Sequence, residues 1–312
     1  MFATSLLSWA RQFFFQQRAL LSHAAAVTPL TAHDFSDLVR NALAEDIGTG
    51  DATSLALIPE HAQASARLVA REPLVVAGVD IAASVFSETH TATRFTARAA
   101  DGDRLPAGAT LLQVAGATRA LLAAERTALN FLQRLCGIAT LTATYVEAIA
   151  GTRAVLLDTR KTTPGWRRLE KHAVACGGAR NHRMGLFDLV LIKDNHLAAL
   201  RDAAPNAVAA AIARARAQYP KLKVEVEADS LEQARQAAEH GADIVLLDNM
   251  PVETLRQAVR ELGGTTKLEA SGGITLANIR AIAETGVDFI SVGALTHSAR
   301  AVDISMELEA LP

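Results

Sequence analysis

The sequence predicts an α/β protein in two parts, which meet near Gly151. Before this residue, short β-like runs are separated by turn residues, as in an antiparallel sheet. After it, short continuous apolar runs alternate with segments of helical periodicity, which is typical of buried parallel strands joined by helices. A chain of 312 residues is also long enough for roughly two domains.

The N-terminal part is predicted to contain helices beside a sheet. Apolar spacing indicates a helix over residues 35–44, followed by a turn-rich acidic loop at 45–51. Two further helices are expected at 120–135 and 138–149, separated by Gly137. The expected strands are 66–71, 74–77, 94–99 and 110–115.

The C-terminal part is predicted to be a β/α barrel. It has six apolar runs and lacks the GxGxxG motif of a dinucleotide-binding sheet, so a barrel is favoured over that fold. The predicted strands are 154–157, 189–192, 224–226, 244–247, 267–268 and 289–292. The predicted helices are 197–218, 231–240, 252–262 and 276–285.

The first 33 residues contain no acidic side chain, and Arg11 and Arg18 interrupt their apolar groups. These groups are too short for a membrane span, which needs about 18 apolar residues. A signal peptide would carry its positive charges before the apolar region rather than inside it. We therefore expect an extension outside the fold, and an organellar transit peptide is the alternative.

The composition is that of an ordinary globular protein, with 50% apolar and 21% charged residues. The formal net charge of −2 gives no general attraction to nucleic acid or to an anionic membrane. Cys136 and Cys176 form no CxxC or metal-spaced pattern, so we expect two buried thiols in a reduced, cytoplasmic protein.

Polar or charged residues follow each predicted barrel strand. Barrel enzymes place their active sites at the carboxyl ends of the strands. A solvated loop explains one such residue, but a set of them at consecutive strand ends predicts a site. The set is Asp158, Lys193-Asp194, Glu227, Asp248-Asn249, Ser271-Gly272-Gly273 and Gly293.

The segment 160–193 is strongly basic, with eight Lys or Arg residues, two His and only two acidic residues. Arg160-Lys161 and His182-Arg183 lie beside turn residues, and Lys193 ends an apolar strand, so its ammonium is expected to reach the barrel mouth. Cations gathered on loops above a barrel need an anionic ligand. The segment therefore predicts a substrate that carries carboxylates or phosphates.

Three other basic residues of this segment fit a simpler interpretation. Arg167, Arg168 and Lys171 have the spacing of a solvated helix face.

Two glycine-containing turns predict a phosphate site. Ser271-Gly272-Gly273 precedes an expected helix, and Ser291-Val292-Gly293-Ala294 lies at the end of the next strand. Backbone N–H groups at a helix N-terminus bind anions, and many barrels form a phosphate site after their last two strands. Glu227 and Asp248 would then hold Mg²⁺ or sugar hydroxyls, and ion pairing with nearby lysines is the alternative.

The motif Asp158-Thr159-Arg160-Lys161-Thr162-Thr163-Pro164-Gly165 resembles that of the quinolinate phosphoribosyltransferases, the carboxylating nicotinate-nucleotide pyrophosphorylases. The resemblance runs from about Leu30 to the C-terminus. His172 stands where the family often has tyrosine, and Ala179 where a third glycine is common, but neither change removes a charge. The other similar segments are 125–130, 169–171, 176–178, 181–186, 192–196, 224–227, 246–249 and 269–274.

The resemblance implies an N-terminal open-faced α/β sandwich and a C-terminal incomplete β/α barrel. We place an extension at 1–27, the sandwich at 28–150, and the barrel with its phosphoribosyl site at 151–295. A C-terminal helix at 296–312 is expected to pack back on the N-terminal domain.

The resemblance also implies an activity. The family is a group of pentosyltransferases that join quinolinate to phosphoribosyl pyrophosphate with Mg²⁺ in NAD biosynthesis. The products are nicotinate mononucleotide, pyrophosphate and carbon dioxide. A homodimer or a larger assembly is implied, in which Arg126 of one subunit completes the partner's site.

Roles can be carried over residue by residue. The catalytic residues implied are Lys161, Lys193, Glu227 and Asp248. The substrate-binding residues implied are Arg126, Thr159, Arg160, Lys161, His182, Arg183, Lys193, Glu227, Asp248, Ser271, Gly272, Gly273, Ser291 and Gly293. Glu227 and Asp248 would hold the ribose hydroxyls and, through the substrate, Mg²⁺.

These residues suit the chemistry of the phosphoribosyl transfer that the resemblance implies. Negative charge develops on the leaving pyrophosphate, so preorganised cations and Mg²⁺ stabilise it. Loss of the 2-carboxylate then leaves a carbanion, for which Lys161, His182 and water are the candidate proton donors.

Three rival functions are less consistent with these residues. They are a related phosphoribosyltransferase of the molybdenum-operon type, another phosphate-handling barrel enzyme, and a non-catalytic anion-binding protein. The set of cations argues against the first two, and Glu227 and Asp248 argue against the third.

Overall fold

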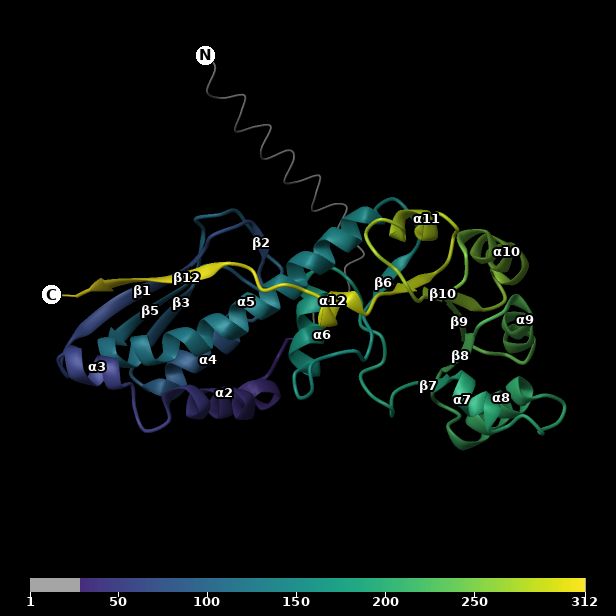
Figure 1. Ribbon diagram of the computed structural model, residues 1–312, viewed down its shortest axis with the longest axis horizontal. Coiled ribbons are helices and arrows are strands. Elements are labelled where there is room, and N and C mark those ends of the chain that lie inside the picture. The colour runs from purple at the N-terminus through teal and green to yellow at the C-terminus, as the bar shows by residue number, and fades with distance from the viewer. Residues whose placement is uncertain (1–28, 312) are drawn as a thin grey trace, which may run out of the picture.

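A computed structural model of the protein describes residues 29–311 and confirms an α/β fold. It contains a four-stranded antiparallel sheet, a six-stranded parallel sheet and a small two-stranded antiparallel sheet of β2 (Leu74–Val75) and β4 (Arg104–Leu105). The extension predicted at 1–27 lies outside the described residues. Figure 1 shows the antiparallel sheet with its helices at one end of an elongated molecule and the parallel sheet with its helices at the other.

The N-terminal part pairs helices with an antiparallel sheet, as predicted. Its elements are α2 (Ala32–Ile47), α3 (Ala52–Leu57), β1 (Gln63–Ala70), β2 (Leu74–Val75), α4 (Val79–Thr89), β3 (Arg94–Ala97), β4 (Arg104–Leu105), β5 (Thr110–Ala117) and α5 (Thr118–Ala148). The helix predicted at 35–44 is confirmed as α2, which begins at a capping box formed by Thr31 and Asp34.

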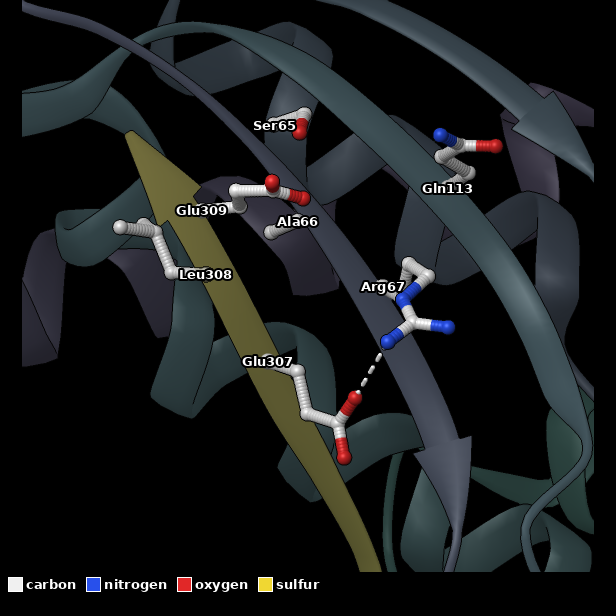
Figure 2. Close-up of a pocket in the computed structure, with 7 residues that line it drawn as sticks. All are labelled: Ser65, Ala66, Arg67, Gln113, Glu307, Leu308 and Glu309. Atoms are coloured by element: carbon white, nitrogen blue, oxygen red, sulfur yellow. Dashed lines mark hydrogen bonds and ion pairs between the residues drawn. The ribbon is translucent and has the colours of Figure 1, made fainter. Parts of the chain in front are cut away.

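One face of the antiparallel sheet is covered by helices and the other is open. The sheet has the order β12-β1-β5-β3, where β12 is Ile304–Ala310, and α5 packs against it. Figure 2 shows the open face, where Arg67 of β1 and Glu307 of β12 form an ion pair of 2.8 Å. Polar residues alternate with buried ones over positions 63–68 of β1, so this part is an open-faced sandwich.

The break predicted at Gly137 is wrong, because α5 runs through it as one helix of 31 residues. Gly137 is instead a point of close approach. A Cβ atom at this position would lie 2.0 Å from the backbone oxygen of Arg300. The glycine therefore admits the returning C-terminal chain rather than ending a helix.

The C-terminal helix predicted at 296–312 is also wrong. A short helix, α12 (Ala294–His297), is followed by the strand β12. This strand pairs antiparallel with β1, so the segment does return to the N-terminal sheet. Its apolar residues alternate with Ser305, Glu307 and Glu309, which is the pattern of a strand.

The C-terminal part is a parallel six-stranded sheet with the order β6-β11-β10-β9-β8-β7. Its elements are β6 (Val155–Leu157), α6 (Arg167–Cys176), β7 (Val190–Ile192), α7 (Asp194–Ala198), α8 (Ala207–Gln218), β8 (Val224–Ala228), α9 (Leu231–Glu239), β9 (Ile244–Asp248), α10 (Val252–Leu262), β10 (Lys267–Ser271), α11 (Ile279–Ala283) and β11 (Phe289–Ser291). The long helix predicted at 197–218 is two helices, α7 and α8. The helix predicted at 276–285 is shorter, as α11.

Strands that follow one another in the sequence also lie side by side in the sheet, with the exception of β6 and β7. These two strands form the two edges of the sheet. The barrel is therefore incomplete. In the segment between these two strands, Arg180 forms a parallel bridge to Leu157 of β6. The helix α6 of this segment packs against α5. Among residues 29–311, no helix is long and apolar enough to cross a membrane.

Candidate active site

A cavity of about 620 Å³ opens at the carboxyl ends of the parallel strands. It brings together twelve of the fourteen residues predicted to bind substrate. Its lining is Thr159, Arg160, Lys161, His182, Arg183, Leu191, Lys193, Glu227, Leu246, Asp248, Asn249, Glu269, Ser271, Gly272, Gly273 and Ser291.

The two predicted residues outside this lining have different positions. Gly293 lies beside the cavity, since a Cβ atom there would be 3.0 Å from Cδ of Lys161. Arg126 is exposed on α5 and does not line the cavity of its own chain.

The loop that carries Arg160 and Lys161 is held from α6. Glu170 is fully buried and accepts hydrogen bonds from the backbone N–H of Thr163 at 3.1 Å and from its hydroxyl at 2.8 Å. Arg167 donates to the Thr162 hydroxyl at 3.0 Å. This helix therefore positions the cationic loop from behind, which sets where its side chains enter the cavity.

A buried ion pair holds the other cationic loop. Lys171 and Asp158 have no exposed side-chain surface and contact each other directly. Asp158 also accepts from the backbone N–H of His182 at 2.8 Å and from Asn181 at 2.7 Å. The solvated-face prediction is thus wrong for Lys171. It holds for Arg168, whose exposed guanidinium pairs with Asp34 at 2.9 Å.

The cations of the cavity crowd one another. Burial lowers the pKa of Arg183, and the neighbouring Arg160 lowers it further. Lys193 is neutralised by Glu227, with which it forms a direct ion pair across β7 and β8. Positive charge therefore concentrates on the side of the cavity formed by Arg160, Lys161 and Arg183, where an anionic ligand would be stabilised.

A glycine turn forms another part of the lining. Gly272 and Gly273 have φ angles of 89° and 60°, in the left-handed region that favours glycine. A Cβ atom on Gly272 would lie 2.2 Å from Oδ1 of Asn249. Asn249 itself has a φ of 53° and donates from its side chain to Asp248 at 2.7 Å. This part of the lining therefore requires a residue without a side chain at position 272.

The sequence interpretation missed two carboxylates beneath the cavity. Glu225 and Glu269 are fully buried and face His182, whose Nε2 lies 3.1 Å from Oε2 of Glu225 and 3.6 Å from Oε1 of Glu269. The sequence does contain a signal for both residues, because side chains two positions apart on a strand point to the same face of the sheet. Glu225 shares its face with Glu227, and Glu269 shares its face with Ser271.

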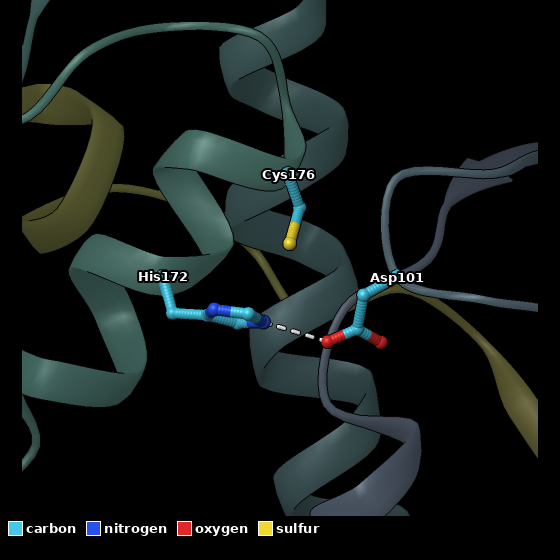
Figure 3. A group of neighbouring side chains, drawn as sticks. All are labelled: Asp101, His172 and Cys176. Atoms are coloured by element: carbon cyan, nitrogen blue, oxygen red, sulfur yellow. Dashed lines mark hydrogen bonds and ion pairs between the residues drawn. The ribbon is translucent and has the colours of Figure 1, made fainter. Parts of the chain in front are cut away.

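Figure 3 shows a second cluster, in which His172 and Cys176 are buried and Asp101 is partly buried. Asp101 accepts hydrogen bonds from the backbone N–H groups of Gly78 and Val79 and contacts Nε2 of His172 at 2.7 Å. Burial raises the pKa of Asp101, but these partners lower it by more. Burial also raises the pKa of the Cys176 thiol. The cluster thus joins α6 to the start of α4 and lies apart from the cavity.

Comparison with known proteins agrees with this geometry. The model of the quinolinate phosphoribosyl transferase N-terminal domain matches residues 51–136, and that of the C-terminal domain matches residues 138–307. The chain is 46% identical to the nicotinate-nucleotide pyrophosphorylase [carboxylating] of Mycobacterium leprae over 278 residues, which are 87% of this chain and 96% of that protein. It is 42% identical to the probable enzyme of Bacillus subtilis, over 87% of this chain and 92% of that protein.

Solved structures of relatives share the whole fold. NadC from Streptococcus pyogenes superposes with a TM-score of 0.87 at 42% identity, over 91% of this chain and 100% of that chain. The nicotinate-nucleotide pyrophosphorylase from Francisella tularensis gives a TM-score of 0.86 at 40% identity, over 92% and 100%. This chain therefore belongs to the quinolinate phosphoribosyltransferase family.

Proposed function

We propose that this protein converts quinolinate and phosphoribosyl pyrophosphate into nicotinate mononucleotide, pyrophosphate and carbon dioxide, a step of NAD biosynthesis. The observation that carries the proposal is the cavity itself. Its lining combines the cations of two loops with the carboxylates Glu227 and Asp248 and a glycine turn. The names of the relatives in Mycobacterium leprae and Bacillus subtilis support the same activity.

The cationic side suits the two carboxylates of quinolinate. Arg160, Lys161 and Arg183 converge from two loops that α6 and Asp158 hold in place. Each charge-assisted hydrogen bond to a carboxylate contributes about 1.5–3 kcal/mol. Three such groups fix both the orientation of the ring and the position of its nitrogen.

The carboxylates and the glycine turn of the lining suit the phosphoribosyl group. Glu227 and Asp248 are acceptors for ribose hydroxyls, and the turn at Ser271, Gly272 and Gly273 lets a phosphate approach the backbone closely. Lys193 would move from Glu227 toward the pyrophosphate as that group leaves with its charge.

Mg²⁺ belongs to the proposal as an ion that arrives with phosphoribosyl pyrophosphate. Mg²⁺ prefers hard oxygen ligands and usually keeps substrate phosphates and water in its shell rather than an all-protein cage. Glu227 and Asp248 fit this role, because they are the carboxylates at the rim of the cavity and leave room for such ligands. When bound, the ion would neutralise charge on the pyrophosphate.

A homodimer is part of the proposal, with Arg126 completing the partner's cavity. Arg126 is exposed and lies outside the cavity of its own chain, so it is available to a neighbour. Leu186 and Phe187, next to the cationic loop, are each 73% exposed, and apolar side chains in such a position suit burial against a second subunit. A cytoplasmic location is also proposed, and the two free, buried cysteines support a reduced setting.

The test is product formation with Lys193→Met beside a matched control. The control is Lys267→Met, because Lys267 lies at the amino end of β10 and pairs with Asp288 at 2.9 Å, away from the cavity. The protein and Lys267→Met should form nicotinate mononucleotide from quinolinate, and Lys193→Met should lose at least about 100-fold in kcat/KM. Equal use of nicotinic acid and quinolinate, or no product at all, would overturn the proposal.

A further inference from the structure

Two anion-binding segments of the site lie against each other beside the cavity. Lys161 belongs to the cationic loop, and Gly293 belongs to the turn that leads into α12. A Cβ atom on Gly293 would lie 3.0 Å from Cδ of Lys161, so the stem of this lysine passes directly over the turn. The spacing between the two segments therefore decides where the ammonium group of Lys161 lies relative to the turn.

The hydroxyl group of Thr296 connects these two segments. Thr296 is fully buried in α12, and its hydroxyl donates a hydrogen bond to the backbone oxygen of Lys161 at 2.8 Å. The backbone oxygen of Gly293 is farther from the same hydroxyl, at 3.2 Å. Because a hydroxyl group has only one proton to donate, the shorter contact with Lys161 is favoured. A buried side chain thus fixes the backbone of the cationic loop against α12.

Arg134 of α5 holds the same two segments from behind. Its guanidinium group donates to the backbone oxygen of Thr296 at 2.5 Å and forms an ion pair of 3.2 Å with Glu170. Glu170 in turn accepts two hydrogen bonds from Thr163, which lies two residues after Lys161 in the cationic loop. These contacts close a ring that runs through Lys161, Thr163, Glu170, Arg134 and Thr296 and returns to Lys161.

The ring joins three helices and lies outside the substrate space. Helices α5, α6 and α12 contact one another, and Figure 1 shows α6 and α12 together near the middle of the molecule. Thr296, Arg134 and Glu170 do not line the cavity. Any effect of these three residues on the reaction is therefore exerted through the position of the segments that they hold. Such effects can be large, since a misplacement of about 1 Å can cost about 100-fold in rate.

We propose that Thr296 is a positioning residue for phosphoribosyl transfer, which fixes the cationic loop at a set distance from the Gly293 turn. Arg134 and Glu170 complete the ring that keeps Thr296 and the loop in place. This inference rests on the proposed function, in which the loop binds quinolinate beside the phosphoribosyl group. Each segment keeps its own binding groups without the ring, so binding of either substrate depends on Thr296 less than the reaction between them does.

The variant that tests this is Thr296→Val, which keeps the shape of the side chain and removes the donated proton. The rate of pyrophosphate release in a single turnover at saturating substrate should fall by about tenfold or more. The concentrations of quinolinate and phosphoribosyl pyrophosphate that give half the maximal rate should stay within about threefold of those of the unmodified protein. An unchanged rate, or a rise in these concentrations at an unchanged maximal rate, would overturn the proposal.

Thr266→Val is the matched control. Thr266 is also buried, and its hydroxyl donates to the backbone oxygen of Ala242 at the same distance of 2.8 Å. It lies just before the amino end of β10, whereas the cavity opens at the carboxyl ends of the strands. Both variants should shift the midpoint of urea unfolding by similar amounts, but only Thr296→Val should slow pyrophosphate release. Equal slowing in both would indicate a general loosening of the fold and would contradict the proposal.

Thr296→Ser tests the hydroxyl group itself. Serine keeps the donor and loses only the methyl group, so its single-turnover rate should lie within about threefold of that of the unmodified protein. A Thr296→Ser variant as slow as Thr296→Val would show that the hydrogen bond to Lys161 is not what matters.

A double variant tests whether the ring acts as one unit. Arg134→Lys keeps the charge but loses the planar group that reaches Thr296 and Glu170 together. Combined with Thr296→Val, it should react within about threefold of the slower single variant, because both changes open the same ring. A double variant whose loss is the product of the two single losses would refute the shared role. Failure of the unmodified protein to make nicotinate mononucleotide would refute the proposed function instead, so the two failures are distinguishable.

Discussion

Lys171→Met should destabilise the fold more than any ordinary change of a charged helix residue. The ammonium of Lys171 is fully buried, pairs with Asp158 and donates to the backbone oxygen of His182 at 3.1 Å. Methionine keeps much of the volume of the stem but leaves Asp158 as a buried charge without its cation. Removing one partner of a buried ion pair typically costs about 3–5 kcal/mol of unfolding free energy.

Arg168→Met is the matched control for this change. Arg168 lies on the same helix, but its side chain is 45% exposed and its ion pair with Asp34 lies at the surface. Such exposed pairs contribute about 0–1 kcal/mol. Urea unfolding followed by circular dichroism should therefore separate the two variants by at least about 2 kcal/mol.

A double variant isolates the cause. Adding Asp158→Asn to Lys171→Met removes the uncompensated buried charge, so part of the lost stability should return. Equal losses of stability in Lys171→Met and Arg168→Met would contradict a stabilising role for the buried ion pair. A double variant no more stable than Lys171→Met would contradict it as well.

Three further predictions follow from the site and the core. Arg126→Ala should raise the KM for quinolinate by about 10- to 100-fold through loss of one charge-assisted contact. Mixing this variant with Lys193→Met should restore some activity through heterodimers, and no recovery would count against a site shared between subunits. Gly272→Ala should raise the KM for phosphoribosyl pyrophosphate by about tenfold or more, because its methyl group would meet the side chain of Asn249 at a left-handed backbone position; an unchanged KM would show that the turn does not approach the substrate. Burial raises the pKa of Cys136 to about 12, so its thiol should stay neutral and resist iodoacetamide at pH 8 in the folded protein. The same thiol should react in urea, and mass spectrometry that finds it modified without urea would contradict its burial.

The barrel strands and the residues at their ends could be predicted from the sequence. Short apolar runs that alternate with helices specify a parallel sheet, and the polar residues that follow them necessarily meet at one edge. For this reason Lys193, Glu227 and Asp248 were predicted from three separate strands, and all three line one cavity.

Features that depend on long-range packing were not predictable in this way. Gly137 has the local signature of a helix break, but its purpose is contact with Arg300, which lies 163 positions later in the chain. Lys171 has the spacing of an exposed helix residue, and only the fold shows that Asp158 buries it. The strand β12 differs from these two cases, because its apolar residues alternate with polar ones and carry a local signal for a strand.

The buried pair Glu225 and Glu269 shows a third kind of miss. A charged residue within an apolar strand suggests a solvated edge or a functional position, and the sequence alone does not distinguish these cases. Glu225 lies two residues before Glu227, and Glu269 lies two residues before Ser271, so each is expected on the same face of its strand as that residue. Only the folded barrel shows that the two carboxylates lie close together.

The most direct test of the account follows the carboxylate that is lost. Quinolinate labelled with carbon-13 in its 2-carboxylate should yield one labelled carbon dioxide and one nicotinate mononucleotide per pyrophosphate released, and no labelled carbon dioxide without phosphoribosyl pyrophosphate. Labelled carbon dioxide in the absence of phosphoribosyl pyrophosphate, or a nucleotide that keeps both carboxylates, would contradict it.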